Sequence, residues 1–418
     1  MSADPTTVAD KLAVELDARL AGADAALERG YPGERPGRQP VHTVYVPADR
    51  YDAGLVAAYG SAALRALDEH AEGFARLVRD DDIVVRVRAK LAAEPVEDLR
   101  IDFEDGYVGR TDADEDVDLV RAATALAASR RDGAAAPFGG IRVKSFEGPT
   151  RHRSVRTLTG FVAALVEGGG SLEGWVVTLP KVTSVDQVEA MLHTCAVLED
   201  ELDLLAGSLR FEIQVETPQS ILGADGTALV ARMVHAAGER LTGLHYGTYD
   251  YSAFCGIAAE QQSMAHPVAD HAKLVMQAAA AGTGVRLSDG STNVLPVGDA
   301  HDVEAAWSLH HQLVRRSLER GYYQGWDLHP AQLPTRYAAT YAFFREGLPR
   351  ALTRLADYAR HVTGGIADEP ATARALSSYV LRGLDCGAVD EAEVVGATSL
   401  TTAALEILAR HRPRSTPS

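Results

Sequence analysis

The chain has little cysteine: only Cys195, Cys255 and Cys386 occur among its 418 residues. Their spacing matches no metal-ligand pattern, and an odd number cannot all pair within one chain. This usage argues against a disulfide-stapled fold and against a cysteine-held metal. We therefore expect a reducing, cytoplasmic environment.

Long apolar runs are also missing. No stretch approaches the ~20 apolar residues that a membrane-spanning helix needs. The N-terminus, Met-Ser-Ala-Asp-Pro-Thr-Thr, lacks the apolar centre of a secretion signal. We expect no membrane partner.

Positive charge is in short supply, with 41 Lys and Arg against 58 Asp and Glu and a formal net charge of -17. Such a chain repels nucleic acid and anionic membranes, so neither is expected as a partner. An anionic small substrate stays possible, because a few arginines and a metal can reverse the field locally. Glycine-rich phosphate loops are absent after the predicted strands, which weakens nucleotide-binding interpretations.

What the chain does have is a regular alternation of strand-like and helical segments. The strand-like segments lie at 44–47, 99–104, 139–144, 174–179, 210–216, 241–247, 293–297 and 326–329. The main helical stretches lie at 51–72, 113–130, 151–167, 185–204, 226–238, 265–281 and 300–320. Eight strands alternating with helices predict an α/β fold, a (β/α)8 TIM barrel rather than an open doubly wound sheet.

The remaining segments are predicted to be helical extensions of this barrel. Residues 1–40 form an N-terminal extension, 41–345 the barrel, and 346–418 a helical C-terminal segment for a lid or for oligomerisation. Breaks in that last segment are expected at Gly364-Gly365 and between 383 and 387. The charged stretch 73–97 looks like an insertion, and its pattern suggests no role.

Polar residues stand at the C-terminal ends of the predicted strands, where the active sites of such barrels lie. Glu216 and Asp250 each close an apolar run. Two carboxylates, with water and substrate oxygens, suit Mg²⁺. The alternative is that each acid merely caps a helix.

A second acidic group follows the strand before Arg142: Asp102, Glu104 and Asp105. Three carboxylates repel one another unless a positive group lies among them. A metal with its water shell or an arginine would supply that charge, and a purely structural ion-pair cluster is the alternative. Arg142 can grip a substrate carboxylate in bidentate fashion, or pair with these acids, or both.

Two further polar residues close strands. Lys181 follows Pro180 and is suited either to a phosphate or carboxylate or to solvent. His329 precedes Pro330 and is either a residue lining the site or a structural histidine. Since no serine nucleophile elbow is present, we discard serine-hydrolase chemistry.

Seven motifs in order, over about residues 41–334, resemble the citrate lyase beta-subunit-like group of the HpcH/HpaI aldolase superfamily. The opening strand, Val44 to Arg50, resembles "LFVPG-x-R", and Ile101 to Tyr107 resembles "DLEDAV". The others are Arg142-Val143-Lys144 ("RVN"), Leu179 to Val182 ("LPKV"), Val215-Glu216-Thr217 ("IETA"), Tyr246 to Gly256 ("FGAEDLAADLG") and Leu328 to Gln332 ("IHPAQ").

The resemblance implies a TIM barrel that uses Mg²⁺, with Mn²⁺ as a possible substitute. It implies that Glu216 and Asp250 bind the metal and that Asp102, Glu104 and Asp105 lie around it, the latter two ordering its waters. Substrate-binding positions carried over from the motifs are Arg142, Lys181, Gly247, Thr248 and His329. A C-terminal lid from a neighbouring subunit brings an acid over the site in relatives, and Asp390 matches it, so Arg142 and Asp390 are the expected catalytic residues.

The function implied is that of a carbon–carbon lyase of the aldol or retro-Claisen type, acting on a hydroxy acid, an oxo acid or a CoA thioester. This chain departs from the family pattern after Lys144 and at Tyr249 and Tyr251, so use of CoA is left open. Alternatives are condensation of glyoxylate with acetyl-CoA as in malate synthase, an aldolase of free 2-oxo acids, and a non-catalytic binding barrel. A homo-oligomer, such as a trimer, is expected.

Overall fold

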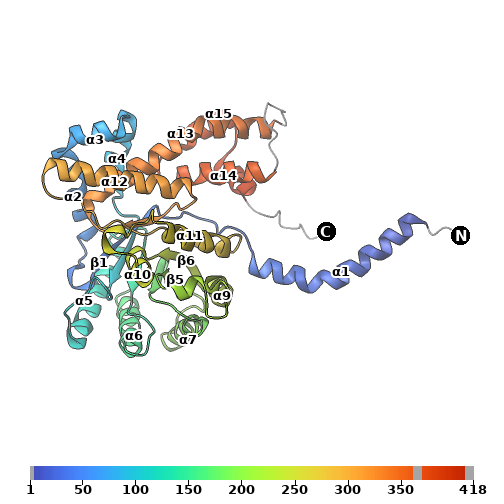
Figure 1. Ribbon diagram of the computed structural model, residues 1–418, viewed down its shortest axis with the longest axis horizontal. Helices are drawn as coiled ribbons and strands as arrows, with labels where there is room; N and C mark the ends of the chain where they lie inside the picture. Colours follow the sequence, from blue (N-terminus) through green and yellow to red (C-terminus); the bar gives the residue numbers. More distant parts are fainter. Residues whose placement is uncertain (1–3, 361–369, 410–418) are drawn as a thin grey trace.

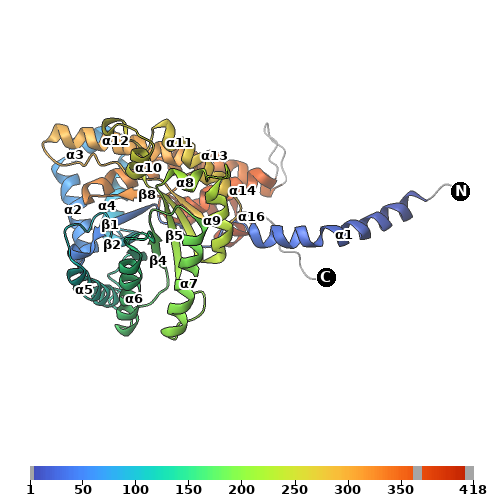
Figure 2. The same cartoon turned by 60° about the horizontal axis from the view of Figure 1, so that its bottom comes forward.

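A computed structural model describes residues 4–360 and 370–409, and in these residues eight parallel strands form one sheet. The sheet lies at the centre of the protein, with helices around it (Figures 1 and 2). The strands follow the order β7-β6-β5-β4-β3-β2-β1-β8. Their bounds are β1 His42–Pro47, β2 Asp98–Asp102, β3 Phe138–Arg142, β4 Trp175–Leu179, β5 Arg210–Val215, β6 Leu241–Tyr246, β7 Arg286–Ser288 and β8 Gly325–Asp327. The predicted (β/α)8 barrel with helical extensions is confirmed.

The barrel closes where the short strand β7 meets β8. Ser288 and Gln324 form a parallel bridge. Just beyond it, Asp289 N donates to Gln324 O at 2.8 Å and Trp326 N donates to Gly290 O at 3.1 Å. These bonds complete the ring and leave no open sheet edge at this seam.

Amphipathic helices cover the barrel. Their apolar faces pack on strands such as β4 and β5, whose residues are almost all buried, as expected for a parallel sheet covered on its outer face. Capping boxes fix two helix starts, at Thr111 and at Ser184. The main barrel helices are α2 Leu55–Glu69, α5 Asp112–Arg131, α6 Arg151–Glu167, α7 Val185–Glu201, α9 Leu229–Ala237, α11 Pro267–Ala280, α12 Ala300–Glu319 and α13 Leu333–Ala359.

The seventh strand lies earlier than predicted. The sequence indicated residues 293–297, but β7 is Arg286–Ser288 and 293–297 form a loop. In this loop Val294 and Val297 are 45% and 51% exposed, and Pro296 has no N–H to give to a ladder. The apolar residues at 293–297 therefore belong to a surface loop. The actual strand, β7, is too short to show a periodic pattern in the sequence.

The stretch 73–97 is helical and packed, so its description as an inserted region needs correction. The predicted helix 51–72 is interrupted near His70, where α3 Ala71–Val78 begins, and α4 Asp81–Ala93 follows. Ile83, Val87 and Leu91 of α4 are buried, and the helix packs on α2 and α13. Asp81 and Asp82 are exposed, and the many charged residues of α4 made the sequence of this stretch resemble an insertion.

The extensions are helical as expected. Helix α1 Pro5–Gly30 precedes the barrel, and α14 Pro370–Asp385, α15 Glu391–Thr398 and α16 Thr402–Ala409 follow it. The break expected between 383 and 387 is present, with Gly387 at φ +82°. The break at Gly364-Gly365 lies outside the described residues. Among the helices that the structure describes, none alone has the length and apolar composition for a membrane crossing, and only the bent pair α15 and α16 together reaches them.

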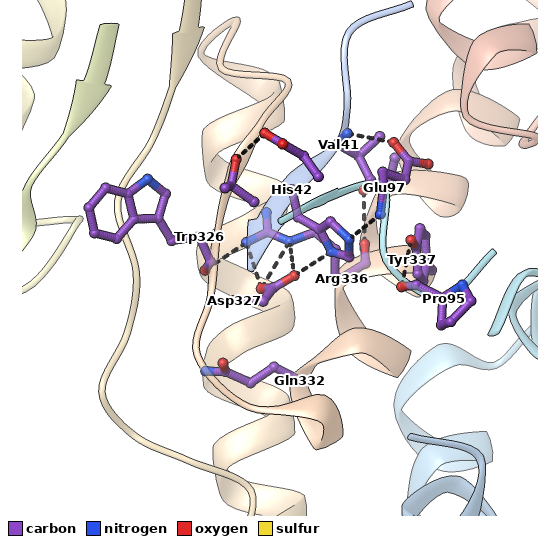
Figure 3. A network of polar contacts seen from close by, with 12 residues as sticks. Val41, His42, Pro95, Glu97, Trp326, Asp327, Gln332, Arg336 and Tyr337 are labelled. Atoms are coloured by element: carbon purple, nitrogen blue, oxygen red, sulfur yellow. Dashed lines mark hydrogen bonds and ion pairs between the residues drawn. The ribbon is translucent and has the colours of Figure 1, made fainter. Parts of the chain in front are cut away.

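A buried carboxylate ties the last strand to the first (Figure 3). His42 Nδ1 lies 2.8 Å from Asp327 Oδ2, and His310 Nε2 lies 3.1 Å from Oδ1. Arg336 donates to the same carboxylate, with Nη2 at 2.9 Å from Oδ1. Burial alone would raise the pKa of Asp327, but Arg336 and the two histidines outweigh it and hold this pKa well below its usual range. The ion is thus fully paired where β8 joins β1.

Candidate metal and substrate site

The polar residues predicted at the strand ends lie at one end of the barrel. Asp102 and Arg142 end β2 and β3, Glu216 directly follows β5, and Lys181 comes two residues after β4. Asp250 lies in the first turn of the short helix α10 Thr248–Phe254, after β6, rather than in the strand itself. The C-terminal ends of parallel strands converge, so these side chains meet although they are far apart in sequence.

Three carboxylates come close together at this end. Oxygen atoms of Asp105, Glu216 and Asp250 all lie within 4.8 Å of one another. Glu216 is 1% exposed, whereas the Asp250 side chain is 38% exposed. One buried and two accessible carboxylates form an oxygen-only donor set that leaves positions open toward solvent, which suits a hard divalent cation such as Mg²⁺.

Glu216 is held in place by its neighbours. The backbone N–H of Lys181 donates to Glu216 Oε1 at 2.7 Å, and the Gln214 amide donates to Oε2. A Cβ at Gly247 would lie 2.5 Å from the Glu216 Cβ, so glycine is required beside this carboxylate. Burial, with Glu104 and Asp250 nearby and only partly offset by Lys181, raises the pKa of Glu216 well above its usual value. An anion at this position therefore calls for additional positive charge.

Lys181 supplies part of that charge. Its ammonium contacts Glu104 and lies 3.0 Å from Asp105 Oδ2 and 3.6 Å from Asp250 Oδ2. Burial opposes the charged form, but Glu216 and Glu104 outweigh it and raise the pKa of Lys181. Its backbone has φ +53°, in the left-handed region that a side chain rarely adopts, directly after Pro180.

Arg142 is almost fully buried and is gripped by Asp102. Its Nε and Nη2 donate to the two Asp102 oxygens at 2.7 and 2.6 Å. The remaining Nη1 lies 3.2 Å from Gln214 Oε1 and 3.3 Å from Glu104 Oε2. Nε and Nη2 of the guanidinium are therefore bound by the Asp102 carboxylate, and Nη1 lies on the side of the acidic cluster.

Both carboxylate oxygens of Asp102 accept more than one hydrogen bond. Besides Arg142, its oxygens accept from the backbone N–H groups of Glu104 at 3.0 Å and Gly106 at 2.8 Å. It therefore fixes Arg142 and the loop after β2. Glu104 differs, because its Oε2 is buried without a hydrogen bond, and burial raises its pKa. At Asp105, burial works in the same direction, but Lys181 and Arg142 outweigh it and lower the pKa.

The other predicted site residues are placed differently. Thr248 is buried against Gly290, and its Oγ1 has no hydrogen-bond partner. His329 caps the turn after β8, with Nδ1 accepting from Ala331 N at 3.2 Å. Asp390 caps α15, and its carboxylate pairs with Arg86 of α4 at 2.6 Å in the same chain. Among the residues that the structure describes, neither His329 nor Asp390 forms a hydrogen bond or ion pair with the acidic cluster.

Three residues that the sequence interpretation missed also shape the site. Gln214 bridges Arg142 and Glu216, and its place two residues before Glu216 on the same strand face could have revealed it. The rings of Tyr45 and Trp326 lie 4.9 and 5.9 Å from the Arg142 guanidinium. These aromatic partners come from β1 and β8, and no local pattern predicts such a contact.

A family model described as a domain of unknown function, DUF6986, matches residues 20–413 of this chain. The chain belongs to the DUF6986 family. The match spans the barrel, about half of the N-terminal extension and nearly all of the C-terminal one. A comparison with curated proteins finds no match.

Solved structures with a similar fold include a citrate lyase from Burkholderia xenovorans LB400, with 20% identity and a TM-score of 0.60, covering 87% of this chain and 98% of the other. A lead(II) complex of Haloferax volcanii malate synthase has 15% identity and a TM-score of 0.50, covering 85% and 88%. The pyruvate/acetyl-CoA ternary complex of the same malate synthase has 14% identity and a TM-score of 0.50, covering 85% and 82%. The resemblance to citrate lyase beta-subunit-like barrels is thus confirmed in the fold.

Proposed function

We propose that this DUF6986 protein is a Mg²⁺-dependent enzyme that breaks or forms a carbon–carbon bond in a small oxo or hydroxy acid. The observation that carries the proposal is the carboxylate set Asp105, Glu216 and Asp250, with oxygens within 4.8 Å at one barrel end. The raised pKa of the buried Glu216 supports a cation there. The seven sequence motifs and the fold point to the same reaction class.

In this proposal Glu216 and Asp250 hold the metal, with Asp105 beside them. The ion would polarise a carbonyl and stabilise the negative charge of an enolate. Mn²⁺ has similar ligand preferences and is expected to replace Mg²⁺.

The protein groups around the cluster have separate tasks. Arg142 Nη1 would exchange its contact with Glu104 for a substrate carboxylate or developing oxyanion, while Asp102 keeps the guanidinium plane fixed. Lys181 can turn its ammonium from the acids to a substrate carboxylate when a metal takes over their neutralisation. Gln214 couples the orientation of Arg142 to that of Glu216.

A proton donor completes the proposed chemistry. Within one chain Asp390 is paired with Arg86, so its proposed role requires that this ion pair opens and that a neighbouring subunit brings the residue over the site. Closure of the barrel end by such a lid would exclude water and protect an enolate from premature protonation.

The test is a substrate panel with pyruvate, oxaloacetate and glyoxylate, each with and without acetyl-CoA, in Mg²⁺ and in excess chelator. Turnover that disappears with chelator and returns with Mg²⁺ or Mn²⁺ supports the proposal. Consumption of glyoxylate only with acetyl-CoA would assign the condensing direction, and conversion of a free oxo acid would assign an aldolase or lyase. Full activity in chelator contradicts metal dependence. Absence of turnover together with tight substrate binding favours the non-catalytic barrel.

A further inference from the structure

Helix α1 projects from the barrel as a long, unsupported rod (Figures 1 and 2). It spans 26 residues, Pro5–Gly30, and none of them is buried. Within residues 4–360 and 370–409, α1 approaches the body at its last turn, where Gly30 and Tyr31 lie near His235. Helices in proteins gain most of their stability by packing an apolar face, so a rod of this length calls for a partner.

One side of α1 is apolar at the spacing of a coiled coil. Steps of four and three residues alternate along the series Ala9, Ala13, Leu16, Leu20, Ala23 and Leu27. The three leucines are 41–52% exposed, although they lie on the side that a packed helix would bury. Leu12 adjoins this stripe and is 51% exposed.

The charges that flank the stripe differ from one side to the other. On one side, Asp10, Asp17 and Asp24 recur every seven residues. On the other side the corresponding positions hold Leu12, Arg19 and Ala26. The two flanks of α1 are therefore electrostatically unlike, one wholly acidic and the other apolar with a single cation.

This asymmetry selects the partner and its direction. In a parallel pair of identical helices, each flank faces the opposite flank of the other copy, which sets Arg19 of one copy near Asp24 of the other. In an antiparallel pair each flank faces itself, and the three aspartates would meet three aspartates. A parallel second copy therefore covers the apolar stripe, pairs Arg19 with Asp24 and keeps the aspartates of the two copies apart.

We propose that α1 forms a parallel two-stranded coiled coil with α1 of a second copy of this chain. The contact is isologous, so each residue of the stripe lies against its own counterpart. The paired rods extend over about 39 Å, at 1.5 Å per residue. The two barrels then lie side by side at the same end of the rod. This interface is separate from the lid of the proposed function and does not depend on it.

The test is disulfide trapping in the full-length chain with Cys255 replaced by Ser, because Cys195 and Cys386 are buried. Leu16→Cys and Leu20→Cys should each give a cross-linked dimer on mild oxidation, because each cysteine meets itself. Val14→Cys is the matched control, since Val14 is 69% exposed on the opposite side of α1. Because α1 carries no buried residue, these variants should fold normally, which thermal unfolding can verify.

Disulfide cross-linking of a Leu27→Cys variant reports whether the apolar stripe and the Arg19–Asp24 contact hold the two helices together. Leu16→Asp with Leu20→Asp should abolish its cross-link, and Arg19→Glu should reduce it by placing like charges together. Adding Asp24→Lys to Arg19→Glu should restore the cross-link. The proposal would be overturned if no cross-link formed at Leu16 or Leu20, or if Val14→Cys cross-linked equally well. Cross-linking only in a mixture of Leu16→Cys and Leu20→Cys chains would also overturn it, because it would reveal an antiparallel pair.

Discussion

Lys181 and Asp250 approach each other to 3.6 Å between Nζ and Oδ2, so an ammonium lies among the carboxylates proposed to bind a metal. The same ammonium is 3.0 Å from Asp105. Lys181 and a divalent cation therefore compete for the same negative charge. The lysine stabilises the cluster without metal, and its presence should lower metal affinity.

We predict that Lys181→Met binds Mg²⁺ at least about tenfold more tightly, which corresponds to about 1.4 kcal/mol. The reason is that a competing cation is removed from the acids. Isothermal titration calorimetry measures the affinity. Lys144→Met is the control, because Lys144 pairs with Glu115 instead. Unchanged or weaker Mg²⁺ binding in Lys181→Met would count against the competition.

Asp250→Asn should weaken Mg²⁺ binding by about 100-fold or more, or about 2.7 kcal/mol, because a charged ligand is lost. Its unfolding temperature should change little, since the side chain is 38% exposed. Calorimetry and thermal unfolding give the two values. Asp302→Asn, in an exposed acidic group at the start of α12, is the matched control. Equal Mg²⁺ affinity in the two variants would remove Asp250 from the site.

Arg142→Lys should lose most activity although it keeps the charge. A lysine cannot hold both oxygens of Asp102 and also reach Gln214, so the substrate-facing donor is misplaced. Loss of these buried hydrogen bonds should also lower the free energy of unfolding by about 1–3 kcal/mol. Steady-state kinetics and denaturant unfolding measure the two effects. Near-normal turnover would mean that Arg142 serves structure only.

Mixing Asp250→Asn and Asp390→Asn chains should partly restore activity if each site takes its lid acid from a neighbour. Some sites in the mixed oligomers then carry neither lesion. Arg86→Gln is the control for structure, because it breaks the same ion pair while leaving the Asp390 carboxylate. If subunit exchange is demonstrated and activity does not return, a lid acid donated in trans is ruled out.

The free energy of unfolding should fall as the pH drops from about 6.5 toward 4. Burial, with His310 and Arg315 nearby and Glu346 opposing, lowers the pKa of His311 to about 4. The unfolded chain has a histidine pKa of about 6.5 and takes up the proton first, so stability is complete above that pH and is lost below it. His311→Gln should flatten this dependence in denaturant titrations. The exposed His301→Gln on the same helix should not, and an equal effect of both variants would contradict the assignment.

Much of the barrel was predictable because local patterns dictate it. The strands around Val177, Ile213 and Leu244 are buried runs of apolar residues, and polar residues follow at their ends. The seventh strand was misplaced because three residues, Arg286–Ser288, are too few to show a pattern. The packed helix α4 was missed because its charged residues outnumber the buried Ile83, Val87 and Leu91.

The site was only partly predictable for a related reason. Residue types indicate which groups can bind a cation, so Glu216 and Asp250 were found. Which of the possible partners each group takes depends on distances across the barrel. The pairing of Arg142 with Asp102, and of Lys181 with three acids, follows from strand register and loop shape, which no local pattern contains.

The Asp327 network also constrains how the chain can fold. His42 and Asp327 are 285 positions apart in the sequence, yet they contact each other directly at the join between the first and last strands. His42 Nε2 can accept from Glu97 N early in synthesis, but His42 Nδ1 cannot meet Asp327 until nearly the whole barrel has left the ribosome. Contacts of such long range form late and slow folding. The final ring closure is therefore a late step, and truncation before Arg336 leaves Asp327 without its guanidinium partner.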